Sequence, residues 1–103
     1  MFYLLKRIDE NQCNIGDEVM VLADFVGVPA GTKGVVTEIY DGGLMVTWAR
    51  LQGERMNQLN TIETIKERIS HGDQFMACQG WRSDGFSRDE LQYLRFKTDT
   101  LIG

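Results

Sequence analysis

Cysteine and histidine are scarce in this 103-residue chain, which holds only Cys13, Cys78 and His71. A structural zinc site needs four nitrogen or sulfur ligands, so the sequence excludes one. The two cysteines lack CxxC spacing, and free thiols in a reducing compartment are favoured over a disulfide between them, which is left open. We therefore expect a fold that its own core stabilises, without a metal.

Long apolar runs are also absent, because no stretch approaches the roughly 20 residues of a membrane-spanning helix. The apolar start, MFYLL, is shorter than the core of a secretion signal, and Lys6 and Arg7 follow it rather than precede it. The sequence therefore predicts a cytoplasmic protein with no membrane partner. The segment Phe2–Leu5 is equally compatible with a strand that joins a sheet.

Positive charge is in deficit, with 11 Lys and Arg residues against 15 Asp and Glu residues and a net charge of −4. Proteins that bind nucleic acid usually carry a basic face or stripe, because phosphate contacts supply most of their affinity. The balance of charge therefore disfavours a nucleic-acid partner.

Motifs that carry chemistry are missing as well. His71 has no nucleophile at a recognisable spacing, and its place at a predicted helix end is explained by the helix dipole. Four acidic residues near predicted turns lack the spacing of a calcium loop and are expected to form turns or face solvent: Asp17, Glu38, Asp24 and Asp41. We expect no enzyme, no cofactor and no metal site.

The run from Ile15 to Trp48 has the pattern of short strands separated by glycines. Alternating and β-branched residues predict strands over Glu18–Leu22, Val35–Tyr40 and Leu44–Trp48. Asp41-Gly42-Gly43 predicts a tight hairpin between the last two strands. The loop between the first two, residues 23–32, holds the single proline and several apolar residues, so we expect it to fold back over one end of a barrel.

Apolar residues then recur at helical spacing, which predicts a helix over Thr61–Ser70. Asn60 is the predicted N-cap, with Glu63 completing a capping box, and His71-Gly72 ends the helix. A short apolar piece follows at Phe75–Cys78.

The last part of the chain begins with an irregular, turn-rich segment over Trp81–Gly85. Ser87 to Glu90 has the spacing of a capping box, which predicts a short helical turn that directs Leu91 and Leu94 inward. A closing strand is predicted over Tyr93–Phe96.

The succession GDEVMVL, PAGTKGVV and MVTW resembles the SH3-like small barrels, including KOW-type domains and the barrel of nitrile hydratase β subunits, over about a third of the chain. The ending GFSRDELQYL resembles small bacterial proteins of this barrel type, in which a helical turn precedes the last strand. The resemblance implies a mainly β, α+β domain over residues 1–103: a five-stranded antiparallel barrel with a helical insertion, at about residues 51–84, before the last strand. It implies no catalytic residue, because the metal ligands of nitrile hydratase lie on its other subunit.

Five residues are candidates for an interaction surface: Trp81, Phe25, Tyr40, Trp48 and Arg82. Three of them, Phe25, Tyr40 and Trp48, suit either an aromatic groove for extended proline-rich peptides or the core of a small barrel, and core packing is favoured. Trp81 lies in a polar stretch and is the strongest candidate.

These observations predict a non-catalytic protein-interaction module that binds another protein or a second copy of itself. The alternative is an accessory protein that binds nucleic acid through a local patch made of Arg50, Arg55, Arg82 and Arg88.

Overall fold

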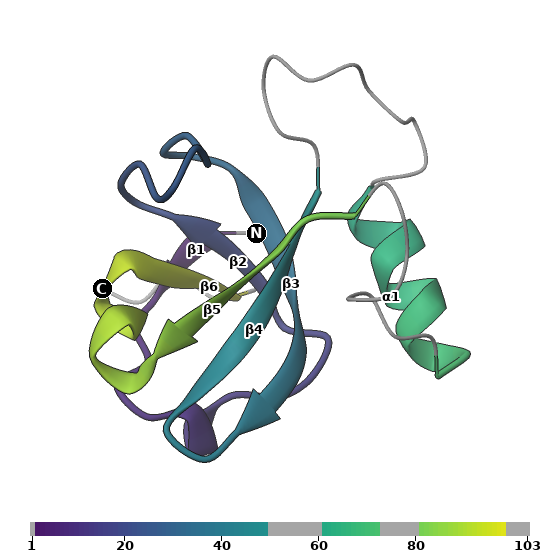
Figure 1. The fold of residues 1–103 in the computed structure, drawn as a ribbon, viewed down its shortest axis with the longest axis horizontal. Helices are drawn as coiled ribbons and strands as arrows, with labels where there is room; N and C mark the ends of the chain where they lie inside the picture. The colour runs from purple at the N-terminus through teal and green to yellow at the C-terminus, as the bar shows by residue number, and fades with distance from the viewer. Residues whose placement is uncertain (1, 50–60, 73–80, 99–103) are drawn as a thin grey trace.

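Six antiparallel strands form one open sheet in the computed structural model, which describes residues 2–49, 61–72 and 81–98 (Figure 1). The strands are β1 (Phe2–Leu5), β2 (Glu18–Val21), β3 (Lys33–Tyr40), β4 (Gly43–Ala49), β5 (Ser83–Ser87) and β6 (Leu94–Thr98). They are hydrogen-bonded in the order β1-β6-β2-β3-β4-β5. The described residues are therefore mainly β with one α-helix, as predicted.

The predicted five-stranded antiparallel barrel differs from the observed sheet in two respects. Phe2–Leu5 forms a sixth strand, which pairs with β6 from Phe2–Thr98 to Leu5–Phe96. Within the described residues, the outermost strands β1 and β5 do not pair with each other, so the sheet remains open. Residue patterns indicate where strands occur but not which edges meet, because edge pairing depends on the curvature of the whole sheet.

The prediction of an irregular segment over Trp81–Gly85 is also wrong, because this region contains the start of β5. Ser83–Ser87 pairs with β4 from Thr47–Ser83 to Gly43–Ser87. Its sequence, SDGFS, has weak strand propensity, and pairing with β4 and burial of Phe86 overrule that propensity. As a result, two strands follow the helix, not one as predicted.

The helix α1 spans Ile62–Ser70, one residue shorter than predicted, and its N-cap is Thr61 rather than Asn60. The Thr64 backbone N–H donates to Thr61 Oγ1 at 3.1 Å. Asn and Thr both suit this position, and the cap falls to Thr61 because its backbone is still extended just before the first helical residue. His71 and Gly72 end the helix as predicted.

Two apolar clusters lie on opposite faces of the sheet. The main core contains Trp48, Phe86 and Phe96 with aliphatic residues from the strands and from the 3-10 turn η3 (Arg88–Tyr93), including Leu91 and Leu94 as predicted. The second cluster joins Val35 and Ala49 to Ile65 of α1, so the helix covers the outside of β3 and β4 (Figure 1). The predicted capping box forms before η3, with the Ser87 backbone N–H donating to Glu90 Oε1 at 2.9 Å.

Glu18 on β2 ties the helix to the sheet. Lys66 Nζ of α1 lies 2.8 Å from Glu18 Oε2, and Lys97 Nζ of β6 lies 3.0 Å from Glu18 Oε1. Partial burial raises the pKa of Glu18, but hydrogen bonds from the two lysines outweigh it and leave that pKa below its ordinary value. The carboxylate is therefore held ionised between two elements that are far apart in the sequence.

Two predictions fall outside the described residues: the apolar piece Phe75–Cys78 and the part of the arginine patch made by Arg50 and Arg55. No helix in the described parts of the chain is both long and apolar enough to span a bilayer.

Candidate functional site

Three of the five candidate interaction residues come together around Phe86 and Asp84 of β5. The Phe25 ring stacks on Phe86 with centroids 4.6 Å apart, and Trp48 meets Phe86 edge-on at 5.9 Å. Trp48 Nε1 donates to Asp84 Oδ2 at 2.7 Å, and Arg82 Nε donates to the same oxygen at 3.2 Å. One connected set of contacts thus joins β4, β5 and the loop between β2 and β3.

Trp48 is a core residue and not part of an exposed groove. Its side chain is 1% exposed, and its indole N–H is bonded to Asp84, which satisfies the donor away from water. This corrects its candidacy as a contact residue and agrees with the core packing that the sequence favoured.

Tyr40 and Trp81 lie away from this set. The Tyr40 side chain is 41% exposed, and its hydroxyl donates to the Leu44 carbonyl at 3.1 Å. Gly85 leaves room for that hydroxyl, because an added Cβ would lie 3.0 Å from it. Trp81 packs partly buried on the cluster under α1, with the Arg68 guanidinium 5.5 Å from its ring. The five candidates therefore do not form one surface.

The loop between β2 and β3 contains a tight two-residue turn at Val26-Gly27. Phe25 and Val28 exchange two backbone hydrogen bonds, of 2.9 and 2.8 Å. Both central residues have positive φ, +44° for Val26 and +82° for Gly27, as a type I′ turn requires. Arg82 Nη2 donates to the Val26 carbonyl and fastens the turn to the start of β5.

A hollow of about 300 Å³ opens beside this turn, lined by Ala23, Asp24, Phe25 and Tyr93. The Leu22 backbone N–H donates to the Tyr93 carbonyl at 2.8 Å, which joins the loop to the end of η3. Two of its lining residues, Phe25 and Tyr93, together with Leu22 and Val26, which flank the lining segment in the chain, form what we call the loop patch; Phe25 is partly buried and the other three are exposed. Sequence reasoning missed Tyr93, although an aromatic residue at the end of a short capped turn was the available signal.

Two of the four acidic residues that were expected to form turns or face solvent, Asp24 and Asp17, form turns. Asp24 Oδ1 accepts from the Ala30 N–H at 2.8 Å, and Asp17 Oδ2 accepts from the Asn14 N–H at 2.8 Å. In the described segments, no group of three or more His, Cys, Asp or Glu residues is arranged to hold a metal ion.

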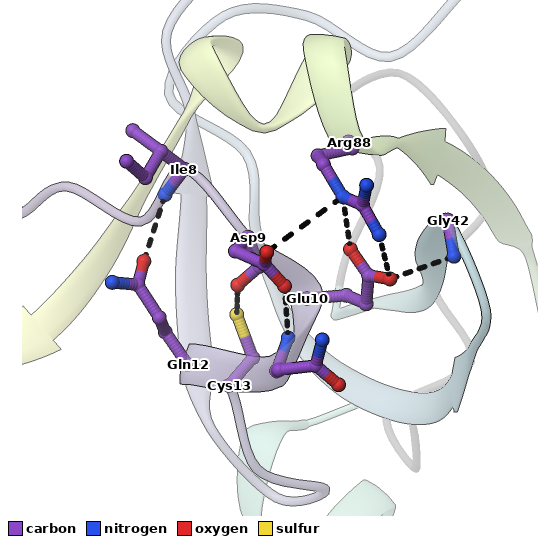
Figure 2. Close-up of polar contacts among 8 residues, drawn as sticks. Ile8, Asp9, Glu10, Gln12, Cys13, Gly42 and Arg88 are labelled. Carbon is purple, nitrogen blue, oxygen red and sulfur yellow. Dashed lines mark hydrogen bonds and ion pairs between the residues drawn. The ribbon is translucent and has the colours of Figure 1, made fainter.

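An ion pair, which sequence reasoning also missed, joins the buried Glu10 to the half-exposed Arg88 (Figure 2). Glu10 lies in the 3-10 turn η1 (Glu10–Gln12) and is 1% exposed. Arg88 Nε and Nη2 donate to its two carboxylate oxygens at 2.7 and 2.6 Å, and the Gly42 N–H donates to Oε2 at 2.7 Å. These hydrogen bonds, those from Arg88 above all, lower the pKa of Glu10 to about 2.

These contacts bear on the alternative arginine patch. The guanidinium of Arg88 is bonded to Glu10, and that of Arg82 is bonded to Asp84 and the Val26 carbonyl. Both groups therefore already have acceptors in the protein, which a phosphate would have to replace.

Cys13 is a free thiol, as predicted; it is also buried, and its Sγ donates to the Asp9 carbonyl at 3.6 Å. Burial raises the pKa of this thiol to about 11, so it is almost entirely protonated at neutral pH. In a Cys78→Ser variant, we expect the native protein to react with a disulfide reagent at least about a hundredfold more slowly than the unfolded protein, because the thiolate is the nucleophile. Reaction at equal rates with and without urea would contradict this placement of Cys13.

No protein-family model, curated protein or solved structure matches this chain.

Proposed function

We propose that this chain is a non-catalytic protein-interaction module whose contact surface is the loop patch. The observation that carries the proposal is the hollow between the β2–β3 loop and the end of η3, with exposed apolar side chains at its edge. Aromatic and aliphatic groups around a small concavity supply the desolvated centre on which protein contacts depend.

The size of the hollow supports a protein partner over a small-molecule ligand. Its volume of about 300 Å³ is at the lower end of ligand pockets, which usually enclose most of their ligand. A hollow of this size accepts one side chain of a partner, while the surrounding surface makes the remaining contacts. Phe25 remains part of the proposed surface, because it lines the hollow. Arg82 stabilises the turn beside it through a hydrogen bond to the Val26 carbonyl.

The proposed ancestry is an SH3-like small barrel to which a strand has been added. It is supported by the antiparallel order β6-β2-β3-β4-β5 and by the 3-10 turn between β5 and β6. SH3-like domains serve many functions, so this ancestry adds a scaffold for binding rather than a particular activity. The free thiol of Cys13 supports a reducing compartment such as the cytoplasm.

Replacing Tyr93 with alanine tests the proposal. The Tyr93 side chain is 43% exposed and forms one wall of the hollow, so its loss should leave the fold intact and remove a contact residue. We expect a partner protein that wild type retains in affinity capture to be retained about tenfold less by Tyr93→Ala, the usual effect of removing an aromatic contact.

Tyr40→Ala is the matched control, because the same residue type is equally exposed (41%) at a site outside the loop patch. It should retain the partner as wild type does. Equal retention by Tyr93→Ala and wild type, with both variants folded by circular dichroism, would refute the loop patch as the contact surface.

A further inference from the structure

We propose that Val26 is the residue through which two copies of this chain associate, each placing its Val26 side chain in the hollow of the other. The proposal rests on the proposed function and deepens it by naming a second copy as the partner.

Val26 occupies a backbone conformation that valine disfavours. A positive φ is uncommon for any residue other than glycine, and a β-branched residue there is an outlier. In a two-residue type I′ turn, asparagine before glycine is the favoured pair, whereas this turn has Val26-Gly27. The side chain is 74% exposed, so burial among the described residues does not offset the strain. Such strain persists where the surrounding structure enforces it, and it is concentrated at functional sites.

The turn holds Val26 rigidly in its exposed position. Two backbone hydrogen bonds between Phe25 and Val28 close it, and Arg82 binds the Val26 carbonyl. Stacking of Phe25 on Phe86 anchors the turn to the core. A side chain presented in this way loses little conformational entropy when it is bound.

The projection and the hollow belong to the same few residues. Ala23, Asp24 and Phe25 line the hollow, and Val26 projects immediately after them. A two-fold dimer uses the same surface on both subunits, so a surface that carries both a projection and a recess is complementary to itself. The loop patch meets this requirement.

Charge favours the same arrangement. The guanidinium of Arg82 travels with Val26, because it is bonded to the Val26 carbonyl, while Asp24 lines the hollow. Docking of Val26 therefore brings Arg82 of one copy toward Asp24 of the other, where its charge, already shared with Asp84 of its own chain, adds a further attraction that occurs twice in the dimer. An apolar patch beside Asp24, in a chain of net charge −4, is poorly suited to binding an anionic membrane surface or nucleic acid.

Val26→Asn tests the inference, because the two expected effects have opposite signs. Asparagine suits the type I′ turn, so thermal unfolding of dilute, monomeric protein should shift to higher temperature than in wild type. The same change replaces the apolar projection with an amide, so the dimer dissociation constant from sedimentation equilibrium should rise at least about tenfold. Ala23→Trp, which fills the hollow from an exposed position, should also raise the dissociation constant.

Ile8→Asn is the matched control, because Ile8 is 76% exposed and lies outside the loop patch. It should dimerise as wild type does. A wild type that stays monomeric from micromolar to millimolar concentration, or a Val26→Asn variant that dimerises equally well, would overturn the inference. A lower melting temperature for Val26→Asn would overturn its first step. Monomeric wild type that still retains another protein through Tyr93 would refute self-association alone and leave the proposed function standing.

Discussion

Replacing Phe86 with alanine is expected to lower the free energy of unfolding by about 3–5 kcal/mol, the usual cost of removing a buried aromatic ring. Phe86 is fully buried and contacts both Phe25 and Trp48. Because the net stability of a domain is only about 5–15 kcal/mol, this single change removes a large part of it. The expected result is a lower urea midpoint with an unchanged slope.

Phe2→Ala serves as the control for this prediction, because Phe2 is an exposed phenylalanine on the outer strand β1. Its replacement should cost much less, since less apolar surface returns to water. Equal losses for the two variants would contradict the assignment of Phe86 to the centre of the core. Phe86→Ala should also loosen the β2–β3 loop, because Phe25 loses the ring on which it stacks.

Breaking the Glu10–Arg88 pair is expected to destabilise the protein strongly at neutral pH and much less in acid. In Arg88→Met, the buried Glu10 carboxylate keeps the Gly42 N–H but loses both guanidinium hydrogen bonds. An unpaired buried carboxylate is costly, whereas removal of both charges is less so. The double variant Glu10→Gln/Arg88→Met should therefore be more stable at pH 7 than Arg88→Met alone.

The pH dependence follows from the lowered pKa of Glu10. A carboxyl group with a folded-state pKa of about 2, against 4.5 in its ordinary state, stabilises the fold fully above pH 4.5. That contribution falls as the pH drops from about 4.5 to about 2, because Glu10 then becomes protonated in the unfolded protein before it does in the folded protein, and this favours the unfolded state. The coupling between Glu10 and Arg88 should shrink over the same interval.

A double-mutant cycle at several pH values provides the measurement. Wild type, Glu10→Gln, Arg88→Met and the double variant are unfolded with urea between pH 7 and pH 2, and the coupling is taken from the four free energies. Because the other carboxylates are present in all four proteins, their titration cancels in the cycle. A coupling that is the same at pH 7 and pH 2 would contradict an ionised Glu10 paired with Arg88.

Local patterns in the sequence predicted much of the secondary structure correctly. Alternation of valines in Glu18–Val21, glycines at Asp41-Gly42-Gly43 and the isoleucines of α1 each involve residues close together in the chain. The capping box before η3 is local for the same reason. Such features depend on backbone conformation and on one buried face, both of which a short stretch of sequence specifies.

The candidate site was harder to predict from the sequence, because its residues come from separate segments of the chain. Phe25 and Trp48 were each identified as candidates, but both contact Phe86. Phe86 lies in β5, which the sequence did not predict as a strand because it is mostly polar. Tyr93 gains its role only from lying beside the β2–β3 loop. Trp81, the strongest candidate from sequence, lies instead against the helix.

The sequence by itself determined the mainly β character, the hairpin, the helix and the inward direction of Leu91 and Leu94. Only the tertiary structure decided that the sheet stays open, that Trp48 is buried, and that Glu10 meets Arg88 across 78 residues. The reason is that strand edges, buried charges and shared surfaces each require two distant segments at once. Their energies depend on the pairing of those segments, which no single stretch of the chain contains.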